Sequence, residues 1–84
     1  MKLMFKLYAT LSDYLPDEAK KTSTLALDLA EGTTVDNLIE RFRLPARLCQ
    51  IVLIDGVFIP PEERAGRILT EGETLAIWPP IAGG

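Results

Sequence analysis

The residues best suited to chemistry stand at the end of the sequence, in the run Trp78, Pro79, Pro80, Ile81, Ala82, Gly83 and Gly84. A strand pattern leads into two prolines, which lack the N–H that a sheet ladder requires, so the strand must stop there. Two residues without a Cβ then carry the carboxylate, and such a slim chain can enter a narrow channel in another protein. The prolines favour an extended course that holds the carboxylate away from the body. The alternative is that Gly-Gly is a frayed end without a role.

Few other side chains in the sequence offer chemistry. There is no histidine, and the single cysteine rules out an internal disulfide. Cys49 borders the apolar run 51–54 and has no histidine to activate it, so we expect a buried, unreactive thiol. The acidic pairs at 62–63 and at 71 and 73 are expected to be solvated turn residues. We therefore predict no catalytic residue, no bound cofactor and no metal site in this chain.

Charge and length limit the classes of partner. Nine Lys and Arg against twelve Asp and Glu give a net charge of -3, and we see no basic cluster beyond Lys20 and Lys21. Nucleic acid is therefore not an expected partner. Eighty-four residues supply one small domain. The N-terminal residues alternate in polarity, unlike a signal peptide, and no stretch is long enough to span a membrane, so we expect a cytoplasmic protein.

The spacing of apolar residues predicts five strands and one main helix. The strands are expected at 2–9, 24–30, 51–54, 57–59 and 74–78, and the helix at 35–43 with a further turn at 45–49. Asp55-Gly56 between two apolar runs is a strong hairpin signal, and Pro60-Pro61 marks the second arm as an edge strand. The segments 10–22 and 62–67 are expected to be loops, the first with at most a short helical turn.

This order of elements predicts an α+β β-grasp fold, which is ubiquitin-like: a mixed sheet of about five strands packed on one main helix. We expect a body at 1–78 and a flexible tail at 79–84. If Leu75 and Ile77 face the helix, Trp78 lies on the open face of the sheet with Ala76, where Met4 and Tyr8 become neighbours if the first and last strands pair. We predict that Met4, Tyr8, Ala76 and Trp78 form a partner-binding face. The alternative is that the indole only covers the sheet, or that a bulge turns it inward.

The sequence resembles the MoaD/ThiS group of ubiquitin-like sulfur carriers over nearly its whole length. The resemblance is carried by the pattern from Phe5 to Leu11, by Gly32-Thr33-Thr34-Val35 before Leu38, by Asp55-Gly56, by Leu69 with Glu71-Gly72-Glu73, and by the ending Trp78-Pro79-Pro80-Ile81-Ala82-Gly83-Gly84. The ending is similar to that of the small subunit of molybdopterin synthase more than to that of the thiamine carrier. Two features depart from the group: Trp78 stands where a phenylalanine is most usual, and Leu44-Pro45 forms an unusual exit from the helix.

The resemblance implies a non-catalytic carrier whose carboxylate is the substrate of partner enzymes. A ubiquitin-activating-type adenylyltransferase would use ATP to adenylate Gly84, and sulfur would then replace the adenylate. The resulting thiocarboxylate would donate its sulfur inside an acceptor such as the large subunit of molybdopterin synthase, with residues 79–84 entering the acceptor's active site.

Three other functions stay open at this stage. One is a carrier whose sulfur is destined for the thiazole of thiamine, since the two branches of the group are close. The activated Gly84 is also open to attack by a lysine amine, which would make the chain a ubiquitin-like protein modifier. A plain interaction domain with an inert tail is the third.

Overall fold

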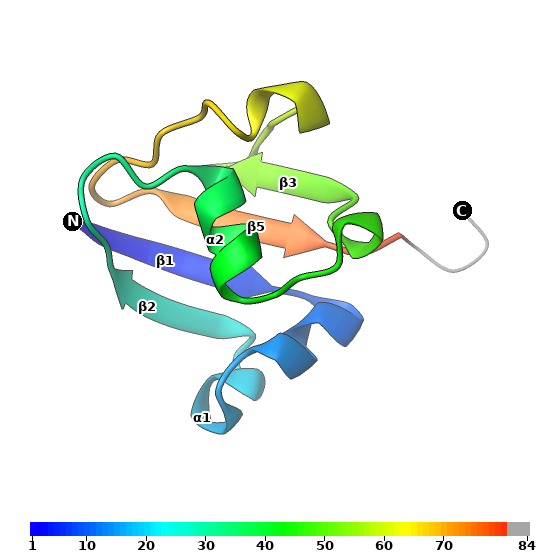
Figure 1. Cartoon of the computed structure of the whole chain (residues 1–84). Helices are drawn as coiled ribbons and strands as arrows, with labels where there is room; N and C mark the ends of the chain where they lie inside the picture. Colours follow the sequence, from blue (N-terminus) through cyan, green and yellow to red (C-terminus); the bar gives the residue numbers. More distant parts are fainter. Residues whose placement is uncertain (81–84) are drawn as a thin grey trace.

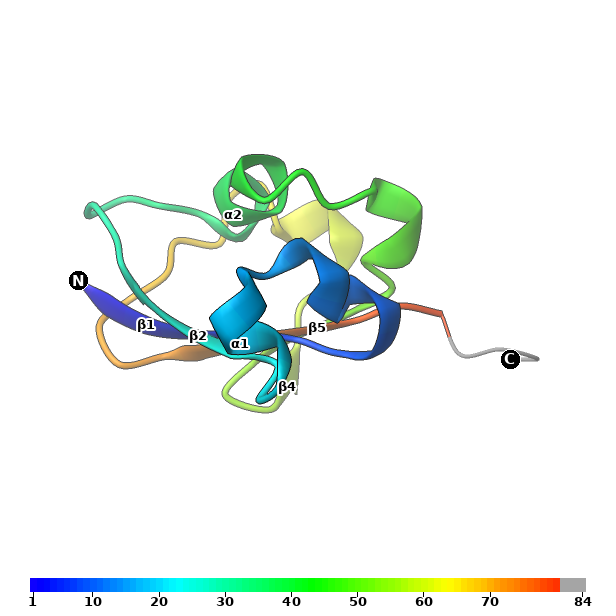
Figure 2. The same cartoon turned by 90° about the horizontal axis from the view of Figure 1, so that it is seen from below.

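The computed structural model describes residues 1–80 of the chain. A five-stranded mixed sheet carries the helical segments on one of its faces (Figures 1 and 2). The strands are β1 (Lys2–Leu7), β2 (Thr24–Asp28), β3 (Ile51–Ile54), β4 (Val57–Phe58) and β5 (Thr74–Trp78), in the spatial order β2-β1-β5-β3-β4. The helices are α1 (Asp17–Lys20) and α2 (Val35–Arg41), and the 3₁₀ turns are η1 (Ala9–Tyr14), η2 (Ala46–Leu48) and η3 (Pro61–Glu63).

The first and last strands lie side by side in the middle of the sheet. β1 pairs in parallel with β5 and antiparallel with β2, and β5 pairs antiparallel with β3. The hairpin at Asp55-Gly56 joins β3 to β4, and Gly56 has the positive φ of +84° that favours glycine at such a turn. β4 lies at one edge of the sheet, which confirms the edge-strand prediction from Pro60-Pro61.

The core lies between the sheet and the helical layer. Alternate residues of the strands point into it, among them Phe5, Leu75 and Ile77, which are fully buried. α2 contributes Val35 and Leu38 from one side of the helix. These contacts confirm the β-grasp prediction and the inward orientation of the last strand.

A capping box begins α2 at the predicted residue. The Thr34 hydroxyl accepts a hydrogen bond from the Asn37 N–H, and the Asn37 side chain accepts one from the Thr34 N–H. The helix ends at Arg41 rather than at Arg43, because Arg43 takes a left-handed φ of +57° that no helix can continue. The turn expected at 45–49 is η2.

Other segments also differ from the sequence-based expectation, and β4 ends at Phe58, one residue earlier than expected. β1 ends at Leu7 rather than at residue 9, because Ala9 has a φ of +53° and begins η1. β2 ends at Asp28, two residues earlier than expected. The segments expected to be loops contain more helical structure: η1 and α1 within 10–22, and η3 overlapping 62–67. Short 3₁₀ turns leave no apolar periodicity long enough to recognise in a sequence.

Candidate functional site

The helices leave one face of the sheet uncovered (Figure 2), and the strand register places the predicted partner-binding residues on it. We call this the open face. In the ladder, Met4 lies opposite Thr74, and Lys6 lies opposite Ala76. Since side chains alternate along a strand, Met4 and Ala76 share this face with Tyr8 and Trp78. The predicted set is therefore placed on one surface.

Tyr8 and Trp78 form the centre of the site. Their rings stack with centroids 4.0 Å apart and planes 9° from parallel. Trp78 remains 38% exposed, so the pair presents aromatic surface to solvent instead of turning inward. The alternative of a bulge that buries the indole is wrong. An aromatic pair of this kind contributes about 0.5–1.5 kcal/mol beyond the area that it buries.

Met4 lies away from this aromatic pair. Lys6 stands between Met4 and Tyr8 on the same face, so the open face carries a cation in its middle. The strand register also places further apolar residues on the open face: Ile51 lies opposite Trp78, and Leu53 lies between Ala76 and Phe58. The sequence did not predict these neighbours, because the register depends on which strands pair. Phe58 is 49% exposed and extends the apolar part of the face onto β4.

Hydrogen bonds from both neighbouring segments hold the end of β5 in place. The Tyr8 N–H donates to the Ile77 carbonyl at 3.2 Å, and the Gln50 N–H donates to the Trp78 carbonyl at 3.2 Å. Pro79 follows and is buried, whereas Pro80 is exposed. Pro79 thus packs with the body, although we expected the tail to begin there. The other predicted tail residues, Ile81, Ala82, Gly83 and Gly84, lie outside the described residues.

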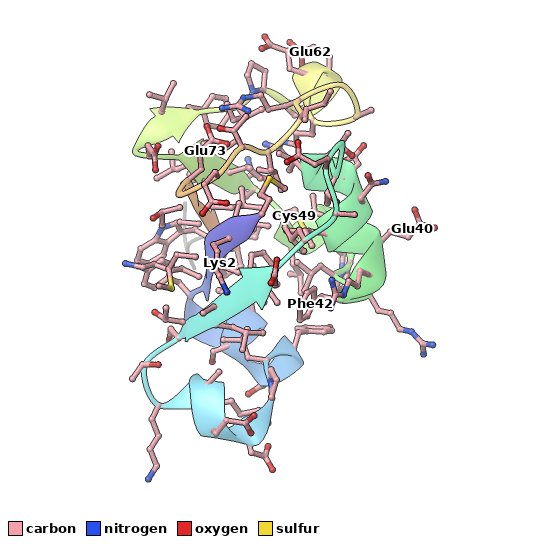
Figure 3. The ribbon with its side chains drawn as sticks, turned by 90° about the vertical axis from the view of Figure 1, so that its left-hand side faces the viewer. Lys2, Glu40, Phe42, Cys49, Glu62 and Glu73 are labelled. Carbon is pink, nitrogen blue, oxygen red and sulfur yellow. The ribbon has the colours of Figure 1, made fainter. Side chains whose placement is uncertain are left out.

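The cysteine is placed as expected. Cys49 is buried, and its thiol donates a hydrogen bond to the Pro45 carbonyl at 3.5 Å. Burial raises the pKa of the Cys49 thiol, which disfavours the nucleophilic thiolate. Figure 3 shows Cys49 inside the molecule, whereas Glu62 and Glu40 lie at its surface.

Glu71 is exposed as expected, whereas Glu73 is partly buried, and both carboxylates also hold backbone groups in place. The Glu71 carboxylate accepts a hydrogen bond from the Lys2 N–H at 2.8 Å. Glu73 accepts from the Thr70 N–H at 2.8 Å and pairs with Arg67 at 2.6 Å. Burial opposes ionisation of Glu73, but the hydrogen bonds from Arg67 and Thr70 outweigh it, so the pKa of Glu73 is lowered. These carboxylates fix the turn that leads into β5.

Arg64 is a structural residue that the sequence did not reveal. It is only 6% exposed, and its guanidinium donates to the carbonyls of Ile59 at 3.0 Å, Cys49 at 2.8 Å and Gln50 at 3.5 Å. The side chain thereby ties the end of the β3–β4 hairpin to the start of β3. Its place in the polar run 62–67 gives no sign of burial, because arginine is usually exposed.

Within residues 1–80, no three acidic, histidine or cysteine side chains come together as metal ligands. None of the helices in this part of the chain has the length and apolar character needed to cross a membrane.

The architecture defines a class of small ubiquitin-like β-grasp proteins, and comparison with known proteins gives the family. The model of the ThiS family matches residues 9–84. The chain therefore belongs to the ThiS family, in the MoaD/ThiS group of sulfur carriers. Small ubiquitin-like proteins of this kind are generally non-catalytic carriers. No curated protein matches the sequence.

Solved structures with the same fold include two from Haloferax volcanii. SAMP1 is 24% identical with a TM-score of 0.65, and the alignment covers 100% of both chains. The HVO 2177 protein is 21% identical with a TM-score of 0.74, over 100% of this chain and 87% of that one. A chain from the complex of subunits 1 and 2 of molybdopterin-converting factor from Helicobacter pylori 26695 is 12% identical with a TM-score of 0.59, over 100% of both chains. At these identities the likeness establishes the fold.

Proposed function

We propose that this protein carries sulfur as a thiocarboxylate on Gly84. In the first step, the carboxylate attacks the α-phosphorus of ATP on a partner adenylyltransferase, and pyrophosphate leaves. A hydrosulfide-level sulfur nucleophile supplied by a partner then attacks the acyl carbon, and AMP leaves. The thiocarboxylate sulfur is a soft, ionised nucleophile at neutral pH, so it can be transferred in an acceptor enzyme. ATP and every catalytic group belong to the partners.

The observation that carries this proposal is the family match, which runs from residue 9 through Gly84 and so includes the tail. Activation is needed because a carboxylate is a poor electrophile, and an acyl-adenylate supplies the leaving group. The sequence contains no histidine, and burial raises the pKa of the Cys49 thiol, which disfavours its use as a nucleophile.

The geometry around β5 supports delivery of the tail to another protein. β5 is hydrogen-bonded on both sides up to Trp78, and Pro79 is buried, so the base of the tail is fixed in direction. The open face begins at the same place with the stack of Tyr8 and Trp78. A partner that binds this face is positioned to receive the tail.

We propose the dithiolene of the molybdenum or tungsten pterin cofactor as the destination of the sulfur. The Pro-Pro-Ile-Ala-Gly-Gly ending resembles the small subunit of molybdopterin synthase. The complex of the two subunits of molybdopterin-converting factor, which contains the same fold, offers a precedent for a sulfur-acceptor partner. The thiazole of thiamine is the alternative destination within the same chemistry.

A second candidate function is conjugation to proteins through Gly84. The same fold occurs in small archaeal modifier protein 1 of H. volcanii, whose name describes a modifier. The activated intermediate is the same in both functions. The nucleophile decides between them, because sulfur gives a thiocarboxylate and a lysine amine gives an isopeptide.

Intact mass measurement of the protein isolated from its native cells tests the proposal. We expect a fraction whose mass reflects the exchange of one oxygen for sulfur, localised to Gly84 by fragmentation. Gly84→Ala should lose this species, whereas Gly66→Ala should keep it, because Gly66 has open space around it and no positive φ. A free carboxylate alone would refute sulfur carriage, and lysine-linked adducts would favour the modifier.

A further inference from the structure

Three arginines gather where α2 ends and η2 follows. Arg41, Arg43 and Arg47 lie within seven residues and are all exposed. Residues 41–54 contain these three arginines and no acidic residue, whereas the remainder of the chain holds six basic against twelve acidic residues. The arginine cluster is thus a local positive surface on an otherwise acidic protein.

Among the residues that the structure describes, no ion pair joins a carboxylate to these three arginines. The ion pairs among residues 1–80 join the N-terminus and Lys2 to Asp28, Lys20 to Asp17, and Arg67 to Glu73, and none reaches the cluster. The fold's own arginines behave differently, since Arg64 and Arg67 are both bonded to backbone or carboxylate groups. The other cations are lysines. Three of the five arginines of the chain therefore lie here and form no ion pair within residues 1–80.

Local structure accounts for only one member of the cluster. Arg41 lies in the last turn of α2, where a cation favours the helix dipole, and its guanidinium lies 5.7 Å from the centre of the Phe42 ring. Arg43 and Arg47 lie beyond the helix. Arg43 even occupies a left-handed position, with φ of +57°, where glycine or asparagine is the ordinary choice. The fold therefore gives no reason for arginine at these two positions.

The η2 end of the cluster, which carries Arg47, adjoins the end of β5. η2 carries Arg47, and Gln50, two residues after η2, donates its N–H to the carbonyl of Trp78 at the end of β5. Figures 1 and 2 both place the green η2 turn beside the end of β5, on the helical side of the sheet. α1, with Lys20, lies at the far edge of the sheet beyond β2. A protein that takes up the tail therefore comes close to the cluster.

We propose that Arg43 and Arg47, with Arg41 beside them, bind carboxylates at the mouth of the channel in which the adenylyltransferase receives the tail. This inference rests on the proposed function. Guanidinium groups match carboxylates in bidentate geometry, and arginine is enriched in protein interfaces whereas lysine is depleted. Nucleic acid is a poorer fit, because a phosphate backbone needs an extended basic surface, and outside residues 41–54 acidic residues outnumber basic ones by twelve to six. The cluster would speed the encounter and orient the tail before it enters.

The test measures association of the full chain with the purified adenylyltransferase of the same organism, by stopped flow with Trp78 fluorescence. The variant R43E/R47E is compared with K20E/K21E, which makes the same change of charge near α1. At about 50 mM salt we expect R43E/R47E to associate on the order of tenfold more slowly, and the difference to shrink at about 500 mM salt. K20E/K21E should stay within about twofold of the parent chain.

The outcomes separate this inference from the proposed function. Circular dichroism and thermal unfolding establish that both variants are folded. Equal slowing of the two variants would indicate a general charge effect and overturn the role of the cluster, as would unchanged association of R43E/R47E. If the cluster has no such role but the enzyme still adenylates the parent chain, the proposed function stands. If it does not adenylate the parent chain at all, the proposed function is refuted, and the inference that rests on it is refuted as well.

Discussion

Replacement of Arg64 by methionine tests whether this one buried side chain holds the tail end of the molecule together. Methionine keeps much of the aliphatic stem and removes the guanidinium, which leaves the carbonyls of Ile59 and Cys49 without their donor. A hydrogen bond from a charged donor contributes about 1.5–3 kcal/mol, so two of them contribute about 3 kcal/mol at the lower bound. The bond to Gln50 is long at 3.5 Å, and we count nothing for it.

The cost of burying a cation favours the lower bound, so we expect Arg64→Met to reduce the free energy of unfolding by about 3 kcal/mol. A domain of this size has a total stability of about 4–13 kcal/mol, so the loss would be a large fraction of it. The melting temperature should fall by about 12 °C or more.

The assay is urea unfolding followed by far-ultraviolet circular dichroism, with the slope m checked for constancy. Arg47→Met makes the same chemical change at an exposed position and should alter stability by less than about 0.5 kcal/mol. Arg64→Lys keeps the charge but cannot reach several carbonyls at once, so it should fall between the two. A loss for Arg64→Met no larger than that for Arg47→Met would refute the reasoning.

Three further predictions concern the open face, the turn before β5 and the entry to α2. Trp78→Ala should weaken binding to the adenylyltransferase at least tenfold while the domain stays folded, and Trp78→Phe should retain most of the affinity. Unchanged affinity of Trp78→Ala in a binding titration would refute the docking role of the open face. The lowered pKa of Glu73 means that its contribution is fully present above its unfolded value of 4.5 and is lost as pH falls further. Between about pH 5 and pH 3, Glu73→Gln should therefore lose less free energy of unfolding than the parent. Parallel curves of the free energy of unfolding against pH would contradict this role of Glu73. Thr34→Ala removes one half of the capping box and should cost about 1 kcal/mol in urea unfolding, whereas a cost near zero would show that the cap is dispensable.

The sequence predicts the fold well because its strongest signals are local. Thr34 before an amphipathic stripe marks the start of α2, and Asp55-Gly56 marks the hairpin, as the structure confirms. Alternation in the last strand also places Trp78 on the open face. What escapes prediction is any feature that depends on a partner distant in the chain. Arg64 is buried only because three carbonyls converge on it.

The candidate site was likewise predicted where it depends on local signals and missed where it depends on distant contacts. Its composition follows from alternation, but the stacking of Tyr8 on Trp78 requires the parallel pairing of β1 with β5, which joins the two ends of the chain. The arginine cluster was not predicted from the sequence for a different reason. Arg41, Arg43 and Arg47 are spaced by apolar residues, so no continuous basic run marks them. That none of them forms an ion pair within residues 1–80 appears only in three dimensions.

The central position of β5 has a mechanical consequence. β5 is paired through four residues with β1 on one side and through four with β3 on the other. A pull on the tail acts along the axis of β5, so it loads the hydrogen bonds of both ladders together in shear instead of opening them one after another. The body should therefore bear tension applied through its C-terminal end far better than tension applied across the sheet at β4, which is held by two register pairs on one side only. The strand that leads to the tail is thus also a firm point by which this molecule can be held.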